Sequence, residues 1–138
     1  MAKSSRKPGA LKGVRFYVVE SDPVDQRIIS YLLGELGADT YSFIEEFETA
    51  ILVSKMLELD IIISDWVHPR QADTDVLALH KNDETISGIP LILVSADNRP
   101  SSREYALREG ARAFLTKPIY LKELEQAIIR CLWPDQRV

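Results

Sequence analysis

The 138-residue chain holds a single cysteine, Cys131, so no disulfide can form within it. It has no uninterrupted apolar run of the ~18–20 residues that a membrane-spanning helix requires. The basic residues near the N-terminus precede no apolar stretch, which argues against a secretory signal. Positive charge is also scarce: 17 Lys and Arg stand against 21 Asp and Glu, and the formal net charge of −4 argues against direct nucleic-acid binding. We therefore expect a cytoplasmic protein with no membrane or nucleic-acid partner.

What is present is typical of a globular protein. Hydrophobic residues make up 46% of the chain, aromatic residues 8% and charged residues 28%. The length suits one domain, and a chain of this size buries roughly two-thirds of its unfolded surface, which is enough for a core without a structural metal. We predict a flexible, basic and solvated tail over residues 1–12, and one domain over residues 13–138.

Short apolar runs alternate with segments whose apolar residues recur at helical spacing. The runs that predict strands cover residues 14–19, 39–43, 59–65, 90–94 and 113–116. The segments that predict helices cover residues 24–36, 45–59, 74–81, 101–109 and 121–132. Strands of nearly continuous apolar residues separated by helices are typical of a parallel sheet buried on both faces. We predict an α/β fold with an open, doubly wound, five-stranded parallel sheet in a three-layer (βα)5 sandwich.

Several side chains carry a prediction about burial. On the helix predicted over residues 45–59, the apolar side chains expected on the inner side are Phe47, Ile51, Leu52 and Met56. Cys131 lies between Ile128 and Leu132 and is expected to be a small core or boundary residue. The two histidines, His68 and His80, have no second histidine or cysteine beside them, and we expect both to be exposed.

Polar side chains follow four of the predicted strands. They are Glu20, Ser21 and Asp22 after the first strand, Asp65 at the end of the third, Ser95 after the fourth and Lys117 after the fifth. In open α/β sheets, ligands bind outside the carboxyl ends of the strands, so these side chains are expected to share one site. Carboxylates, a hydroxyl and an ammonium are the groups that phosphoryl transfer to a carboxylate requires. Asp65 would then be a nucleophile that forms an acyl phosphate, with Mg²⁺ held by carboxylate and carbonyl oxygens.

Two other classes of protein with related chemistry are excluded, because each needs a feature that this sequence lacks. A phosphatase of the haloacid-dehalogenase type needs a second aspartate two residues after the nucleophile, and that position holds Val67. A nucleotide-binding protein needs a glycine-rich loop after its first strand, and that segment reads Glu20-Ser21-Asp22-Pro23.

The chain resembles the receiver domain of two-component response regulators over roughly residues 13–133. Four segments, in the order that the family has them, carry this resemblance. They are Val18-Val19-Glu20-Ser21-Asp22-Pro23, Ile62-Ile63-Ser64-Asp65-Trp66-Val67-His68-Pro69, Val94-Ser95-Ala96 and Phe114-Leu115-Thr116-Lys117-Pro118. They look like the acidic-pair, phospho-acceptor, hydroxyl and lysine segments of that family. The resemblance implies a flavodoxin-like fold.

The resemblance also implies a role for individual residues. Asp65 corresponds to the phosphorylated aspartate, and Lys117 to the lysine that contacts the phosphoryl group or the carboxylate. Ser95 corresponds to the switch hydroxyl. Phe114 corresponds to the aromatic ring whose rotamer depends on that hydroxyl, and it would turn inward when Ser95 moves toward the pocket. The backbone carbonyl of Val67 falls where the family offers an oxygen to Mg²⁺.

The chain departs from the family at the acidic pair, which here is Glu20 and Ser21. Serine offers only a neutral hydroxyl in place of a direct carboxylate ligand, so Ser21 is a weak or lost metal ligand. Asp22 comes one residue late, although a turn could bring its carboxylate to the cation. We expect a weakened Mg²⁺ site. Two further departures, His68 and Asp73, affect the surface around the pocket without removing its chemistry.

Trp66, directly after the acceptor, has two open interpretations. It could flank the mouth of the pocket, where it would restrict access of a phosphodonor or touch a partner, or it could be a partly buried loop aromatic.

Two functions remain open at this stage. The first is a stand-alone response regulator, since the chain is too short for a receiver and an output domain. It would accept a phosphoryl group from a sensor histidine kinase or a histidine phosphotransfer protein. It would then bind a downstream protein through a face that contains Tyr105, Phe114 and Trp133, as a monomer or weak homodimer. It would not be an enzyme beyond self-catalysed phosphotransfer and autodephosphorylation. The second is a degenerate pseudo-receiver, which would bind proteins independently of phosphorylation.

Overall fold

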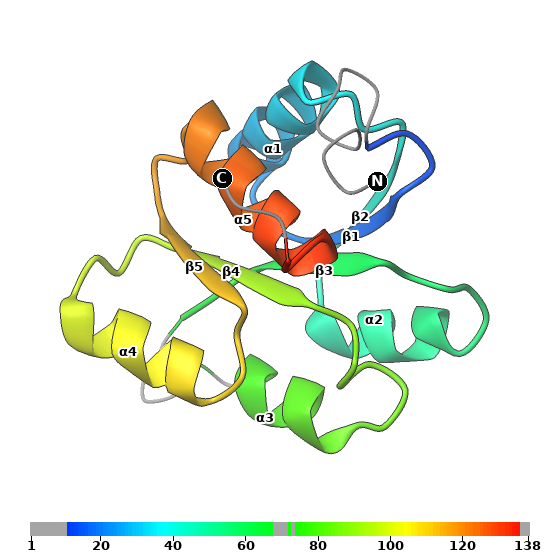
Figure 1. Cartoon of the computed structure of the whole chain (residues 1–138). Coiled ribbons are helices and arrows are strands. Elements are labelled where there is room, and N and C mark those ends of the chain that lie inside the picture. The colour runs from blue at the N-terminus through cyan, green and yellow to red at the C-terminus, as the bar shows by residue number, and fades with distance from the viewer. Residues whose placement is uncertain (1–10, 68–71, 73, 136–138) are drawn as a thin grey trace.

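The computed structural model of the chain describes residues 11–67, 72 and 74–135. In these residues five strands alternate with five helices along the chain (Figure 1). The strands are β1 (Arg15–Val19), β2 (Thr40–Ile44), β3 (Ile61–Asp65), β4 (Leu91–Ser95) and β5 (Ala113–Thr116). The helices are α1 (Pro23–Glu35), α2 (Phe47–Ser54), α3 (Val76–Asn82), α4 (Pro100–Arg108) and α5 (Leu121–Leu132).

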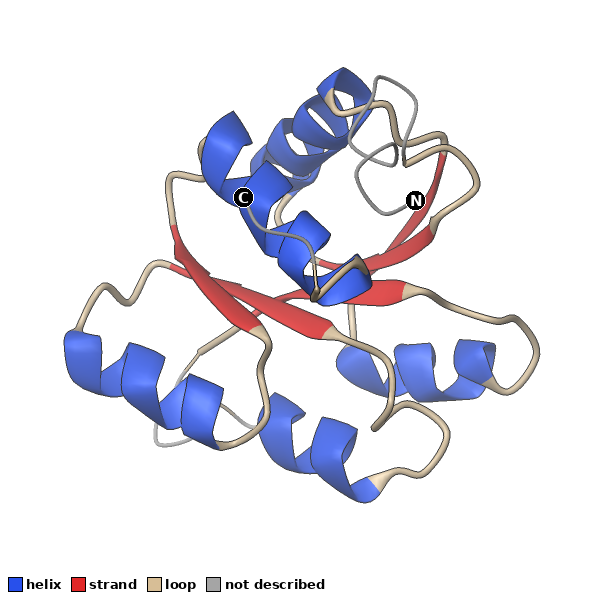
Figure 2. Ribbon diagram, viewed as in Figure 1, coloured by secondary structure: helices blue, strands red, loops and turns tan. Residues whose placement is uncertain are grey.

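The strands form one parallel sheet in the order β2-β1-β3-β4-β5. Helices α1 and α5 cover one face of the sheet, and α2, α3 and α4 cover the other (Figure 2). The sequence prediction of an open, doubly wound, three-layer α/β sandwich is therefore confirmed. Because the order reverses between β1 and β3, the loops after these two strands border the crevice where ligands bind in such sheets.

Alternating side chains of the central strands build a core on each face. Ile61 and Ile63 of β3 belong to the cluster that packs against α1 and α5, and Ile62 belongs to the cluster on the opposite face. We call the α1 and α5 side the first core cluster and the α2, α3 and α4 side the second. Burial of each isoleucine contributes about 1.5–3 kcal/mol, so strand β3 is held firmly from both sides.

Only three residues separate helix α1 from the end of β1, and the first turn of the helix is capped. The carboxylate of Asp22 accepts a hydrogen bond from the backbone N–H of Asp25 at 2.9 Å, and Pro23 occupies the first helical position. The helix ends before Gly37, whose φ of 90° lies in the left-handed region that favours glycine. These caps place the first turn of α1 beside the carboxyl end of the sheet.

Helix α2 differs from the sequence prediction in length and in the face that it buries. It ends at Ser54 rather than near residue 59, and Phe47 and Ala50 are the residues that face the sheet. Leu52 is 64% exposed and Met56 is 83% exposed, so their predicted inner position is wrong. Leu52 lies about 200° around the helix from Ala50, which turns it to solvent, and Met56 lies beyond the end of the helix.

The structure also bears on the predicted burial of Leu11, His80 and Cys131. Leu11 falls in the predicted tail, yet it is buried in the first core cluster, so the compact unit starts before residue 13. His80 is buried rather than exposed, and its Nε2 lies 2.7 Å from the carbonyl oxygen of Ile89. Cys131 is buried, as predicted.

Some predictions lie outside the described residues. They concern His68, Pro69, Asp73 and the tail over residues 1–10. Within the part of the chain that is described, no helix combines the length and the apolar character needed to cross a membrane.

Candidate functional site

Three of the predicted site residues meet at the carboxyl end of the sheet. Lys117 follows β5, Asp65 ends β3 and Glu20 follows β1. The Lys117 Nζ lies 3.1 Å from Asp65 Oδ1 and 3.4 Å from Glu20 Oε1. One ammonium therefore bridges carboxylates from two neighbouring strands, although 52 and 97 residues of chain separate it from them.

A fourth member of this group, Asp25, was not predicted from the sequence. Its Oδ2 lies 2.8 Å from Lys117 Nζ, closer than either of the other two carboxylates. Asp25 reaches the site from the first turn of α1. Asp22, which was predicted to turn its carboxylate to the cation, instead uses that carboxylate to cap α1. The sequence offered one signal for this position. Asp25 follows the N-cap residue Asp22 by three positions, which places it in the first turn of α1.

The electrostatics of the site reflect partial burial of these charges. Glu20 is buried, and burial raises the pKa of its carboxyl, although the hydrogen bond from the backbone N–H of Asp22 opposes this. Burial alone would lower the pKa of Lys117, but its hydrogen bonds to Asp25 and Asp65 raise that pKa above the usual value. Lys117 is therefore a fixed positive charge, since it stays protonated throughout the neutral range.

Ser95 lies beside this group, at the end of β4, and is buried. Its Oγ accepts a hydrogen bond of 3.0 Å from the backbone N–H of Asp97, and its carbonyl accepts one of 2.8 Å from the backbone N–H of Lys117. The Asp97 carboxylate in turn accepts hydrogen bonds from Arg99 and Ser102. The Ser95 hydroxyl is thus connected to the loop that starts α4.

Aromatic rings connect the end of β3 to α4. Trp66 and Phe114 are each only 2% exposed and belong to the second core cluster, against which Tyr105 packs. Of the two interpretations of Trp66, neither the pocket-mouth position nor the partly buried position is correct. Phe114 already points inward, so an inward rotation is not needed to bury its ring.

The predicted partner face of Tyr105, Phe114 and Trp133 spans the edge strand β5 and the helices on either side of it, and the Phe114 side chain within it is buried. Trp133 packs against the first core cluster, whereas Tyr105 and Phe114 belong to the opposite side of the sheet. Tyr105 on α4 and Trp133 after α5 are each partly exposed.

A cleft of about 470 Å³ opens beside Asp65. Its lining includes Glu20, Ser21, Asp65 and Val67, which are four of the residues predicted to form a metal site. Carboxylate, hydroxyl and carbonyl oxygens are the ligands that a hard divalent cation prefers, so this donor set fits Mg²⁺ in its chemistry. Among the described residues, however, no three His, Cys, Asp or Glu side chains form a ready-made metal cluster. Lys117 lies among the carboxylates instead.

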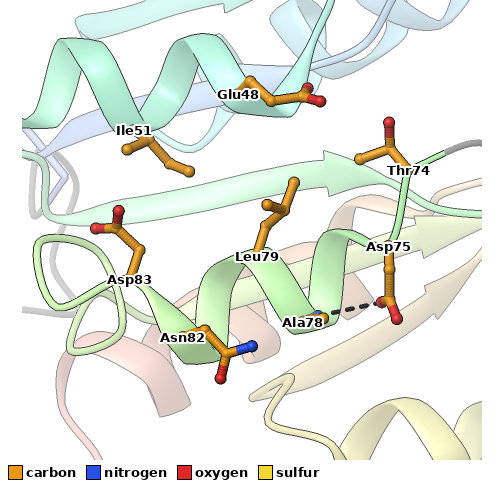
Figure 3. Close-up of a pocket in the computed structure, with 8 residues that line it drawn as sticks. All are labelled: Glu48, Ile51, Thr74, Asp75, Ala78, Leu79, Asn82 and Asp83. Carbon is orange, nitrogen blue, oxygen red and sulfur yellow. Dashed lines mark hydrogen bonds between the residues drawn. The ribbon is translucent and has the colours of Figure 1, made fainter.

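A second cavity, of about 450 Å³, lies between α2 and α3 (Figure 3). Glu48 and Thr74 line both this groove and the cleft beside Asp65, so the two hollows are neighbours. Ile51 and Leu79 face each other across the groove, and the Asp75 carboxylate accepts a hydrogen bond from the backbone N–H of Ala78 at its end. The acidic cleft is therefore extended along the surface between these helices.

Comparison with known proteins shows which family this chain resembles. A family model described as the response regulator receiver domain matches residues 16–129. The chemotaxis protein CheY-3 of Vibrio cholerae is 22% identical over 117 residues, which cover 85% of this chain and 90% of that protein. The two-component response regulator ORR1 of Oryza sativa is 24% identical, and the match covers 81% of this chain but only 52% of that protein.

Solved structures show the same fold. The receiver domain of a sensor histidine kinase from Pseudomonas aeruginosa PAO1 has a TM-score of 0.70 at 24% identity, with 87% of this chain and 97% of that chain covered. That structure holds a magnesium ion coordinated in its active-site cleft. The receiver domain of the TMAO respiratory system response regulator TorR has a TM-score of 0.73 at 25% identity, covering 89% of this chain and 99% of that chain.

Proposed function

The chain belongs to the response regulator receiver family, and we propose that it accepts a phosphoryl group on Asp65. The donor is a phosphohistidine on a sensor histidine kinase or a histidine phosphotransfer protein. Receiver domains are signalling domains of two-component systems and are generally not classed as enzymes. Such a phosphotransfer would take place in the cytoplasm.

The observation that carries this proposal is the contact between Asp65 and Lys117. The Asp65 carboxylate lies at a strand end, and its side chain is 35% exposed, so a donor can reach it. One carboxylate oxygen attacks phosphorus, the bond between phosphorus and the histidine nitrogen breaks, and its electron pair stays on the imidazole. Lys117 Nζ, 3.1 Å from Asp65, provides a fixed positive charge beside the oxygens on which negative charge spreads.

Mg²⁺ is the cofactor that we propose for this step. Glu20, Asp65 and the carbonyl of Val67 would hold the ion, with Ser21 as a neutral hydroxyl at its edge. When bound, Mg²⁺ offsets the charge of the incoming phosphoryl group. Because Ser21 has no carboxylate and Asp22 caps α1, we propose that the ion is bound more weakly than by a pair of acidic residues.

We propose that Ser95 couples phosphorylation of Asp65 to the loop that starts α4. A phosphoryl group adds about −1.5 to −2 charges at Asp65, which draws hydroxyl donors toward it. Ser95 would then give up its contact with the Asp97 backbone, and the loop that starts α4 would repack. Unphosphorylated protein would already visit this arrangement, and phosphorylation would shift the population. Tyr105 on α4 is proposed to report this change to a downstream protein, with the chain acting as a stand-alone receiver, as a monomer or weak homodimer.

The test is incubation of the chain with a small phosphodonor and Mg²⁺, followed by intact-mass measurement. We expect the mass of one phosphoryl group to be added, and Asp65→Asn to abolish the adduct. Asp83→Asn is the matched control, because Asp83 lies in the groove between α2 and α3 but outside the cleft. If the folded chain gains no adduct at any Mg²⁺ concentration, the chain is a pseudo-receiver that binds proteins independently of phosphorylation.

A further inference from the structure

We propose that Asp25 is a positioning residue of the phosphorylation site, which holds the Lys117 ammonium so that Glu20 and Asp65 stay available to a divalent cation. The inference rests on the proposed function of Asp65. It assigns a task to a carboxylate that comes from helix α1 rather than from a strand end.

The distances around Lys117 place Asp25 first among its partners. Lys117 Nζ lies 2.8 Å from Asp25, 3.1 Å from Asp65 and 3.4 Å from Glu20. An ammonium has three N–H donors, and here it faces three carboxylates. The shortest of the three contacts has the length of a strong charge-assisted hydrogen bond, whereas the contact with Glu20 is long.

The position of Asp25 is fixed by the local structure of α1. Its backbone N–H donates to the capping carboxylate of Asp22, and Pro23 restricts the same turn. Gln26, the next residue, donates from its side-chain amide to the carbonyl of Glu20. The first turn of α1 is thus attached to the end of β1, so the Asp25 carboxylate is presented to Lys117 by a rigid element.

The consequence concerns competition for the carboxylate oxygens. Lys117 and a divalent cation both require the oxygens of Glu20 and Asp65, and Ser21 adds no negative charge to help the cation. If Asp25 loses its charge, the ammonium relies on Glu20 and Asp65 alone and contacts them more closely. A cation must then displace it at a greater cost, so removal of the Asp25 charge weakens cation binding.

The experiment is a Mg²⁺ titration of the full chain without phosphodonor, followed by the NMR shifts of the amides of residues 65–67. We expect Asp25→Asn to weaken Mg²⁺ binding by up to about fivefold, the upper end of the range for one exposed ion pair. Asp25→Glu should restore most of the affinity. Glu35→Gln is the matched control: it removes the same charge from the exposed C-terminal end of the same helix and should leave binding unchanged.

A double-mutant cycle tests whether Asp25 acts through Lys117. In the Lys117→Ala background the effect of Asp25→Asn should be largely lost, because there is no ammonium left to hold. An equal effect in both backgrounds, an unchanged affinity of Asp25→Asn, or an equal loss in Glu35→Gln would each overturn the proposal. So would the absence of any Mg²⁺-dependent shift in the wild-type chain. None of these outcomes depends on phosphorylation, so failure of the phosphodonor test is recognised separately.

Discussion

Trp66 packs edge-on against Phe114, with ring centroids 5.6 Å apart and ring planes at 80°. Trp66 follows the proposed acceptor directly, and Phe114 lies in β5, three residues before Lys117. Tyr105 stacks on the same indole, with ring centroids 6.4 Å apart and ring planes at 29°. Through Tyr105, the residue that follows Asp65 is therefore in direct contact with helix α4.

The buried indole makes the chain sensitive to truncation at this position. Trp66→Ala should reduce the free energy of unfolding by about 3–5 kcal/mol, the range for removal of a buried aromatic side chain. Trp66→Phe should cost less, since it keeps a ring against Phe114. Urea denaturation followed by circular dichroism measures both. Leu52→Ala, at an exposed position of α2, is the control and should change stability little. A loss at Trp66→Ala no larger than that of the control would contradict the buried position.

A carboxylate introduced at position 21 should strengthen the Mg²⁺ site. Ser21→Asp should strengthen Mg²⁺ binding by about 2 kcal/mol, the Coulomb energy in water between a divalent ion and one further carboxylate about 4 Å away. Ser21→Asn, which is neutral and similar in shape, should show no gain. Titration by NMR or calorimetry measures the difference. Equal affinities of Ser21→Asp and the wild type would mean that another carboxylate already supplies this charge.

Loss of the central ammonium should destabilise the site. Lys117→Ala leaves the buried Glu20 with the backbone N–H of Asp22 but without a cation, and we expect a loss of about 1–3 kcal/mol, the range for removing one partner of a buried polar group. Added Mg²⁺ should recover more stability in Lys117→Ala than in the wild type, because it replaces the missing positive charge. Thermal melts with and without Mg²⁺ test this. Lys81→Ala, which removes an exposed ion pair with Glu109, should lose little and gain nothing from Mg²⁺.

The buried His80 predicts a pH dependence of stability. Burial lowers the pKa of His80 below its usual value, although its hydrogen bond with the Ile89 carbonyl opposes this. Below about pH 6.5 the unfolded chain therefore binds a proton that the folded chain does not, and stability falls as the pH drops through that window. Above that pH both states are neutral and the effect is absent. His80→Gln does not titrate, so its stability should fall less between pH 7 and pH 5 in urea denaturation. Parallel curves for the two proteins would contradict this.

The sequence alone determined the elements and the edge at which the site forms. Apolar runs of five or so residues, each followed by polar side chains, were sufficient to locate all five strands and to place Glu20, Asp65, Ser95 and Lys117 at strand ends. Parallel strands share one carboxyl edge, so this much follows from local pattern and from the rule of right-handed crossovers. The boundaries of α2 did not follow, because the apolar residues around Leu52 and Met56 continue a helical pattern beyond the point where the backbone leaves the helix.

The tertiary structure decided which side chains meet. Asp25 and Lys117 are 92 residues apart, and no periodicity within either segment predicts their contact. Trp66 and Trp133 both follow predicted elements, yet packing places them against opposite faces of the sheet. His80 is buried because its ring reaches the carbonyl of Ile89 across the turn that follows α3. Local sequence specifies backbone conformation and the pattern of burial, whereas a contact between distant residues depends on how the whole sheet and its helices are packed.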